Sequence, residues 1–251
     1  MATMCATKLV RSRVEPESGS PVESHHATLH STMDCFAKAR MLTFGRNTRL
    51  VGAVLFWSIA VTAVWLGGIA VCPGGTCRVL EFDRWILGAL HAVRQPALDE
   101  FFRAVTWLGS ISVLFPAALV LAWWFRRRGQ LNTVALLPLL AVGGAWLFAY
   151  VGKLLAVRPR PELYPALIEM PVDPSFPSAH AMQITAFVLT CTLAPRTLFG
   201  WVCVAGATLL VLVVALSRLY LQVHFPSDVV IGVIVAIGWA GGLRLLSRKA
   251  A

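Results

Sequence analysis

The sequence contains few charged residues. Asp, Glu, Lys and Arg make up 14% of its 251 residues, whereas a soluble domain carries about 25%. Apolar residues make up 57%, and the mean hydropathy is +0.72. The alternative to a membrane protein, a soluble domain with unusually many buried core helices, fits this composition poorly.

Charge is also missing from long continuous stretches. Several runs are long enough for a helix to cross the hydrocarbon layer of a bilayer, which takes about 20 residues. The long uncharged runs are 50–71, 104–125, 131–152 and 197–217, and two shorter runs are 181–195 and 229–243. We therefore predict an all-α integral membrane protein with six transmembrane helices.

Basic residues gather on one of the two sides that these spans define. The net charge of +10 would suggest nucleic-acid binding in a soluble protein. Here the loops alternate sides, and one side holds Arg40, Arg46, Arg49, Arg126, Arg127, Arg128, Arg196, Arg244, Arg248 and Lys249. The positive-inside rule places that side, with both termini, in the cytoplasm. We expect membrane lipids as partners and no nucleic acid.

The sequence lacks two further features. It has no cluster of carboxylates suited to Mg²⁺ and no glycine-rich nucleotide-binding loop. We therefore predict no metal ion and no cofactor.

The first part of the chain differs from the rest. Residues 1–45 are polar with little periodicity, which predicts a disordered cytoplasmic tail before a six-span domain at 46–251. His25, His26 and His30 could ligate a metal ion, but a solvated tail is the simpler interpretation.

Residues 79–105, between the first two spans, have the periodicity of an amphipathic helix. The apolar positions recur at spacings of three and four residues: Phe82, Trp85, Ile86, Ala89, Leu90 and Val93. Asp83, Arg84 and Arg94 fall elsewhere. We expect a helical segment at the outer membrane surface, near the lipid entrance of any outward-facing site. A plain packing segment is the alternative.

Two cysteines lie on the same outer side. Cys72 and Cys77 flank a Pro-Gly-Gly turn in an oxidising compartment, which favours a disulfide bond. Two free thiols are the alternative.

One group of cations lies against the charge bias. Lys153, Arg158, Arg160 and Arg218 fall at span ends on the outer side. An anionic ligand on the outer face would explain them.

Three short clusters contain these cations. In "KLLAVRPRP", Pro159 and Pro161 stop the helix, so the arginines leave the span in extended chain. In "PSAH", Ser178 is placed to cap a helix whose N-terminus suits a phosphate group. In "SRLYLQVHFPSD", His224 and Asp228 flank the start of the last span, where Pro226 fits a first helical turn.

Together, the clusters resemble the signature of the type 2 phosphatidic acid phosphatase superfamily, K-x(6)-R-P, P-S-G-H and S-R-x(5)-H-x(3)-D. This chain matches the first and third motifs in full, and Ala179 replaces the usual glycine in the second. The resemblance covers residues 50–246. The spacing from Lys153 selects Arg160, rather than Arg158, as the family arginine.

The resemblance implies a role for each matched residue. His224 attacks phosphorus and forms a phosphohistidine, Asp228 orients the imidazole, and His180 protonates the leaving oxygen. The expected phosphate-binding residues are Lys153, Arg160, Ser178, Ala179 through backbone N–H groups, and Arg218. Three cations can stabilise a dianion without a metal ion, so we expect a metal-independent phosphatase.

The resemblance also implies a lipid phosphate as substrate, of the undecaprenyl diphosphate, phosphatidic acid or phosphatidylglycerophosphate class. The motifs contact the phosphate, so they do not select among these lipids. A lipid phosphotransferase and a non-catalytic lipid-phosphate binder or transporter are the alternatives. We expect the inner membrane of a bacterium, with the site on the outer, periplasmic face; the sequence leaves the oligomeric state open.

Overall fold

The computed structural model describes residues 47–191 and 198–247. The predicted disordered tail lies outside the described residues. Residues Gly52–Arg248 form one compact unit, and this unit contains all the predicted site residues.

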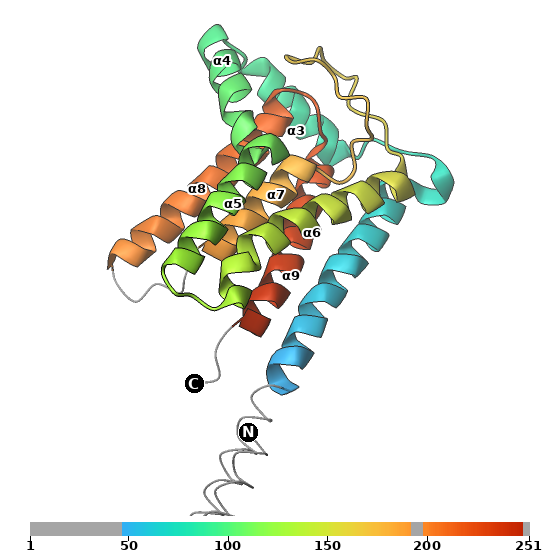
Figure 1. The fold of residues 1–251 in the computed structure, drawn as a ribbon. Helices are drawn as coiled ribbons and strands as arrows, with labels where there is room; N and C mark the ends of the chain where they lie inside the picture. The colour runs from blue at the N-terminus through green and yellow to red at the C-terminus, as the bar shows by residue number, and fades with distance from the viewer. Residues whose placement is uncertain (1–46, 192–197, 248–251) are drawn as a thin grey trace, which may run out of the picture. The chain divides into compact units, whose positions relative to one another are not determined.

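Every regular element of the described residues is helical, which confirms the all-α prediction (Figure 1). After a first helix, Asn47–Val71, the elements are η1 (Pro73–Gly75), α3 (Glu81–Ala92), α4 (Pro96–Val105), η2 (Thr106–Gly109), α5 (Ile111–Arg127), α6 (Asn132–Ala156), α7 (Ala179–Cys191), α8 (Leu198–Tyr220) and α9 (Pro226–Ser247). The predicted disulfide between Cys72 and Cys77 is present and closes a short loop around η1.

Within the part of the chain that the structure describes, four helices are long and apolar enough to cross a membrane. They are the helix Asn47–Val71, residues Thr133–Ala156 of α6, residues Gly200–Tyr220 of α8, and α9. A fifth span results if α4, η2 and α5 together count as one. Since α7 has 13 residues, it is shorter than a full span, and the expectation of six spans stays a prediction.

The run 104–125, expected to be one helix, is broken in the structure. The part that ends in η2 meets α5 at 47°. At the break, Ser110 Oγ accepts a hydrogen bond of 3.3 Å from a backbone N–H of the first turn of α5 and so caps that helix. A Cβ atom on Gly109 would lie 3.2 Å from His180 Cβ. The break therefore brings the chain into close contact with the beginning of α7.

The amphipathic segment forms two helices, because Pro96 starts α4 after an extended residue. The predicted division of its faces is partly wrong. Phe82 and Trp85 are 50% and 72% exposed, whereas Asp83, expected on the polar face, is fully buried. Leu87, one turn further on, is buried as well. The inner face of α3 thus contains a carboxylate.

The helix α7 is the most enclosed element of the described residues. It contacts α5, α6, α8 and α9, and its residues 181–186 are all buried. The cluster that it shares with the first helix, α6 and α9 contains mainly small side chains: Ala60, Ala141, Ala145, Ala149, Ala186, Ala236 and Ala240. In a bilayer the hydrophobic effect contributes little to helix association, and small residues stabilise it by letting the helices pack closely.

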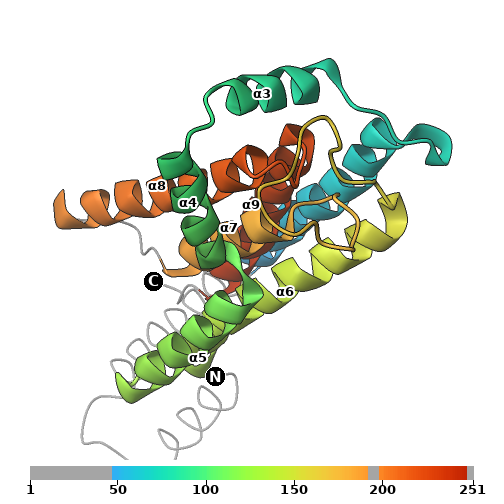
Figure 2. The same ribbon diagram turned by 90° about the horizontal axis from the view of Figure 1, so that it is seen from above.

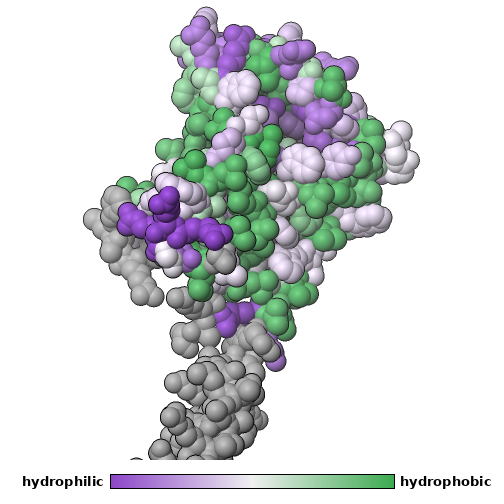
Figure 3. All heavy atoms as spheres, in the orientation of Figure 1, coloured by the Kyte–Doolittle hydropathy of each residue, from purple (hydrophilic) through white to green (hydrophobic). Residues whose placement is uncertain are grey.

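Large apolar side chains cover much of the outer surface. Hydrophobic residues predominate over the middle of the face shown in Figure 3, and hydrophilic ones gather at the end where α3 and α4 lie. The exposed residues include Leu55, Trp65, Trp123, Leu154, Trp201 and Leu209. Such a surface is unfavourable in water and is typical of helices that face lipid.

A long loop, 157–178, joins α6 to α7 and contains no helix. Val157, with a left-handed φ of 46°, turns the chain away from the end of α6. Arg94 donates a 2.8 Å hydrogen bond to Pro165 O, and Arg103 donates a 2.9 Å bond to Leu167 O. Figure 2 looks onto this end of the helices and shows α3 and α4 flanking the loop. The two short helices therefore fix the loop that contains the predicted arginines.

Candidate functional site

The predicted site residues lie at helix ends that meet at one end of the unit. Lys153 lies in the last turn of α6, and Arg218 lies in the last turn of α8. His180 and Asp228 lie in the first turns of α7 and α9, and Pro226 begins α9 as predicted. Each of these helices begins or ends within or next to one of the three sequence clusters. The prolines of the clusters limit the helices there, so the clusters lie together at the helix ends.

A cavity of about 200 Å³ lies between these helix ends. It is lined by the predicted residues Lys153, Arg160, Ala179, His180, Arg218 and His224. The other two predicted residues, Ser178 and Asp228, are fully buried. Ser178 directly precedes Ala179, and Asp228 lies beside His224. The structure therefore brings the predicted residues into one region, although they are spread over more than 70 residues of sequence.

His224 is held between an arginine and a carboxylate. Its Nε2 lies 3.3 Å from Arg160 Nη1. A guanidinium group can only donate, so Nε2 is the acceptor and the ring proton is on Nδ1. His224 Nδ1 is buried without a hydrogen bond, and it lies 3.6 Å from Asp228 Oδ2, just beyond hydrogen-bond range. This tautomer leaves the lone pair of Nε2 on the side of the cations.

The surroundings of His224 disfavour its protonated form. Burial, followed by the positive charges of Arg160, Arg218 and Lys153, lowers its pKa well below the usual value for histidine. The imidazole is therefore neutral at neutral pH, which is the form that can act as a nucleophile.

Ser178 directly precedes α7, as expected for a capping residue, but the expected capping hydrogen bond is not formed. Its Oγ is buried and has no hydrogen-bond partner. The backbone N–H of Ser178 instead donates to Asp228 O at 3.1 Å, and α9 approaches closely because a Cβ atom on Gly232 would lie 3.0 Å from Ser178 O. The hydroxyl therefore has an unused hydrogen-bond donor at the start of α7.

Arg218 keeps part of its hydrogen-bonding capacity. Its Nη1 donates to Thr106 Oγ1 at 2.7 Å, whereas its Nε is buried without a partner. The residue is 2% exposed and lines the cavity. An anion in the cavity would give this buried charge a partner, which a buried cation needs.

An aspartate of the long loop, Asp173, was not predicted. Its carboxylate lies 2.9 Å from Lys153 Nζ and 2.8 Å from Arg160 Nη2. Partial burial raises its pKa, but hydrogen bonds and charge from Lys153 and Arg160 outweigh that effect and lower the pKa to about 2. The two cations thus already bind a carboxylate, which shows that their arrangement accommodates an anion.

Arg158, which the motif spacing set aside, is also part of this region. It is 1% exposed and donates to Asp228 Oδ1, whereas His224 Nδ1 faces Asp228 Oδ2. Only the repeated Arg-Pro of "RPRP" could have indicated a second arginine with a role. Ser110, Trp146 and Gln183 line the cavity as well, and no motif pointed to them.

Within 47–191 and 198–247, no group of three or more His, Cys, Asp or Glu residues could hold a metal ion. The ionic groups that face the cavity are instead mostly cations. Such a lining suits an anionic ligand.

Comparisons with known proteins agree with the motif. The model of the PAP2 superfamily matches residues 134–250, a range that contains every predicted site residue. The chain is 31% identical over 166 residues to phosphatidylglycerophosphatase B of Bacillus subtilis (strain 168), across 62% of this chain and 79% of that protein. It is 36% identical over 126 residues to decaprenylphosphoryl-5-phosphoribose phosphatase of Mycobacterium tuberculosis, across 44% of this chain and 65% of that protein.

Solved structures give the same result. The crystal structure of a transmembrane PAP2-type phosphatidylglycerolphosphate phosphatase from Bacillus subtilis superposes with a TM-score of 0.59 at 27% identity, covering 75% of this chain and 92% of that chain. The structure of Aquifex aeolicus LpxE superposes with a TM-score of 0.56 at 25% identity, covering 66% of this chain and 96% of that chain.

Proposed function

Since the chain belongs to the PAP2 superfamily, we propose that it is an integral membrane phosphatase that hydrolyses a lipid phosphomonoester or diphosphate. The observation that carries the proposal is the single cavity lined by three cations and two histidines. Phosphoryl transfer needs positioning and charge stabilisation more than elaborate chemistry, and these side chains supply both.

The first half-reaction makes a phosphohistidine. The Nε2 lone pair of His224 forms a bond to phosphorus while the bond from phosphorus to the lipid oxygen breaks. His180 gives its proton to that oxygen, so the lipid leaves as an alcohol or, from a diphosphate, as a monophosphate. Asp228 faces the Nδ1–H of His224 and stabilises the positive charge that develops on the ring.

The second half-reaction restores the enzyme. A water oxygen attacks phosphorus, and neutralised His180 takes the proton of that water. The nitrogen–phosphorus bond breaks, its electron pair returns to Nε2 of His224, and inorganic phosphate leaves.

The cations replace a metal ion in this proposal. Lys153, Arg160 and Arg218 bind the non-bridging phosphoryl oxygens, together with Ser178 Oγ and the N–H groups near Ala179. Asp173 supports this role for two of them, because its carboxylate contacts Lys153 and Arg160 in the way a phosphoryl group would. Activity is therefore expected to persist in EDTA.

Ala179 replaces the usual glycine of the second motif. It begins α7, where alanine adopts the helical conformation without strain, and it lines the cavity. Its methyl group reduces the space beside the phosphate. We expect retained activity with an altered rate or an altered preference for substrate size.

We also propose that the chain crosses the membrane six times. In this count, the bent pair of residues Pro96–Gly109 and α5 is one crossing, and α7 is another. The charge bias supports a topology with both termini in the cytoplasm and the cavity on the outer face of a bacterial inner membrane. Exposed Phe82 and Trp85 would anchor α3 in the membrane surface. Reporter fusions at Gly129 and Pro165 should report opposite sides, inside and outside respectively; the same side for both would contradict this topology.

The substrate class follows from the relatives only in outline. These relatives include a phosphatidylglycerophosphatase and a decaprenylphosphoryl-5-phosphoribose phosphatase, so a glycerophospholipid and a polyprenyl phosphate are both candidates. Undecaprenyl diphosphate, phosphatidic acid and phosphatidylglycerophosphate form the test set. A lipid phosphotransferase uses the same first half-reaction with a lipid hydroxyl in place of water.

The testing experiment measures phosphate release by the purified protein in detergent from these three lipids, without added metal and with EDTA. Release from at least one lipid, absent in His224→Ala, supports the proposal. A lipid that loses its phosphoryl group without free phosphate appearing would indicate a phosphotransferase. Binding without any turnover would indicate a non-catalytic binder.

A further inference from the structure

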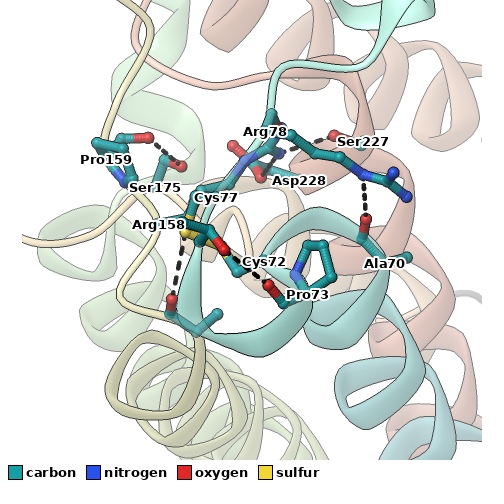
Figure 4. The surroundings of a disulfide bond; sticks show 12 residues. Ala70, Cys72, Pro73, Cys77, Arg78, Arg158, Pro159, Ser175, Ser227 and Asp228 are labelled. Carbon is teal, nitrogen blue, oxygen red and sulfur yellow. Dashed lines mark hydrogen bonds and ion pairs between the residues drawn. A yellow bond between two sulfur atoms is a disulfide. The ribbon is translucent and has the colours of Figure 1, made fainter.

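Arg158 forms a buried ion cluster with two aspartates behind the catalytic histidine. Its Nη1 donates to Asp228 Oδ1 at 2.6 Å, and its Nη2 donates to Asp83 Oδ2 at 2.9 Å. The side chains of Arg158, Asp83 and Asp228 are 1%, 0% and 0% exposed. Figure 4 shows Arg158, Ser227 and Asp228 beside the disulfide. One guanidinium therefore joins α3, the long loop and α9.

Further contacts fix the cluster from several sides. Ser227 Oγ accepts from Arg158 Nη1 at 2.8 Å and donates to Asp83 Oδ2 at 2.8 Å, while Ser227 N donates to Asp83 Oδ1 at 2.9 Å. The carbonyl of Arg78, next to the disulfide, accepts from Arg158 Nη2 at 2.9 Å. The guanidinium carbon also lies 4.0 Å from the centre of the Phe225 ring. The planar group is thus held on its edges and on one face.

The two oxygens of Asp228 have separate partners. Oδ1 accepts from Arg158, whereas Oδ2 accepts from Phe225 N at 2.9 Å and faces His224 Nδ1. A carboxylate with one oxygen fixed in this way cannot rotate freely about its last bond. Arg158 and the Phe225 N–H together therefore fix the direction in which Oδ2 points.

The charges of the cluster do not cancel. Arg158 carries one positive charge, and Asp83 and Asp228 together carry two negative charges, so the cluster keeps a net charge of −1. If Asp83 were uncharged, Arg158 and Asp228 would form a neutral pair. Because of the second carboxylate, the negative charge of Asp228 is not fully neutralised by Arg158 and can stabilise a positive charge on His224. This interaction is strong because the buried site has a low dielectric constant.

We propose that Asp83 and Arg158 are positioning residues for catalysis, acting on His224 through Asp228. The inference rests on the proposed function, because it assigns these residues to the step in which His224 attacks phosphorus. It makes α3 a functional part of the active site. The competing explanation is that the cluster only attaches α3 to the rest of the unit.

A double-mutant cycle separates the two explanations. The variants are Asp83→Asn, Asp228→Asn and the double variant, with kcat and KM measured on p-nitrophenyl phosphate and on the best lipid substrate. We expect Asp83→Asn to lower kcat about tenfold, as for other residues that orient a reacting group through a partner, and to change KM less than threefold. If Asp83 acts through Asp228, the double variant is no slower than Asp228→Asn alone.

Leu87→Ala is the matched control. Leu87 is fully buried on the same face of α3, one turn from Asp83, and contributes packing without charge. Loosening α3 in this way should change kcat by the same factor in the wild-type protein and in the Asp228→Asn background. Thermal unfolding of each variant in the same detergent compares how far α3 is destabilised.

The outcomes decide the proposal. Losses from Asp83→Asn that multiply with those of Asp228→Asn, or a kcat equal to wild type in folded Asp83→Asn, would overturn it. If Asp83→Asn does not fold, the cycle is repeated with Arg158→Lys, whose single ammonium group keeps the charge but cannot fork to both carboxylates; additive losses there would overturn it as well. An inactive wild-type protein would contradict the proposed function itself.

Discussion

Arg158 and Arg160 are two residues apart in the same loop, and each binds aspartate, but in opposite surroundings. Arg158 and its partners, Asp83 and Asp228, are almost completely buried. Arg160 lines the cavity, and its partner Asp173 has a side chain that is 50% exposed. Solvent does not reach the first arrangement, so we expect it to be permanent. Asp173 is open to water, so we expect the second to exchange when another anion binds.

The comparison explains why one sequence motif contains two arginines. A buried cation needs fixed partners, and its removal leaves uncompensated charge. A cation at a binding site needs a partner that can leave. Pro159 separates the two residues and fixes the backbone between them. Arg160 lines the cavity and contacts His224 Nε2, whereas Arg158 does not line it and contacts Asp228 Oδ1.

The largest expected effect concerns the cavity side, where we propose that the chemistry takes place. His224→Ala removes the proposed nucleophile and should abolish activity on both a lipid phosphate and p-nitrophenyl phosphate. In the first half-reaction, His180→Ala removes only general-acid help, typically ~10²–10⁴-fold. Its kcat/KM should fall that much on the lipid but far less on p-nitrophenyl phosphate, whose leaving group is stable as an anion. Values of kcat/KM at one pH, which report the first half-reaction, test this, and rescue of His224→Ala instead would reverse the two roles.

The second effect concerns the stability difference between the two arginines. Arg158→Ala leaves two buried carboxylates without a counter-charge and should cost about 3–5 kcal/mol of unfolding free energy. Arg160→Ala should cost about 1 kcal/mol or less, because exposed Asp173 can be solvated. Thermal or denaturant unfolding in one detergent compares them. Equal losses would remove the distinction between a permanent and an exchangeable pair.

A smaller effect tests whether Asp173 competes with phosphate. Asp173→Asn removes the carboxylate that competes with phosphate for Lys153 and Arg160. The inhibition constant of inorganic phosphate should therefore be roughly two- to fivefold lower in the variant than in the wild-type protein, which corresponds to the loss of one partly exposed ion pair. Phosphate inhibition constants on p-nitrophenyl phosphate provide the measurement. An unchanged or weaker inhibition would show that Asp173 does not occupy the phosphate position.

The smallest effect is a shift in pH dependence. Because burial and neighbouring cations lower the pKa of His224, its neutral form persists to lower pH than that of a free histidine. Activity that depends on His224 is lost only as pH falls through its lowered pKa. In His180→Ala with p-nitrophenyl phosphate, where the general acid cannot titrate, kcat/KM should therefore be unchanged from pH 7 to below 6.5, after correction for titration of the substrate phosphate. A decline centred at or above the usual histidine value would contradict the neutral His224 described here.

The sequence alone predicted much of this molecule. Uncharged runs indicated the helices that are long enough to span, because a bilayer imposes a simple length and composition. The three motifs identified residues that converge at one cavity. The Cys72–Cys77 disulfide was equally predictable from local chemistry, whereas the break that Pro96 introduces was not foreseen.

What could not be predicted depends on contacts between distant residues. Asp83 appeared to belong to a polar face, since nothing local indicates that Arg158, 75 residues later, would neutralise it. Asp173 was indistinguishable from any loop carboxylate until Lys153 was seen beside it. The bend near Ser110 falls within an uncharged run, where hydropathy gives no signal for a change of direction.

The central claim is that His224 forms a covalent bond to phosphorus. It is tested most directly by mass spectrometry of the His224 peptide after an alkaline quench of His180→Ala turning over p-nitrophenyl phosphate, because loss of the second-step base should let the intermediate accumulate. We predict a peptide that carries one phosphoryl group on His224 and that is absent when His224→Ala is added. Continued release of p-nitrophenol by the His180→Ala, His224→Ala double variant, with no phosphorylated peptide in either protein, would contradict the account.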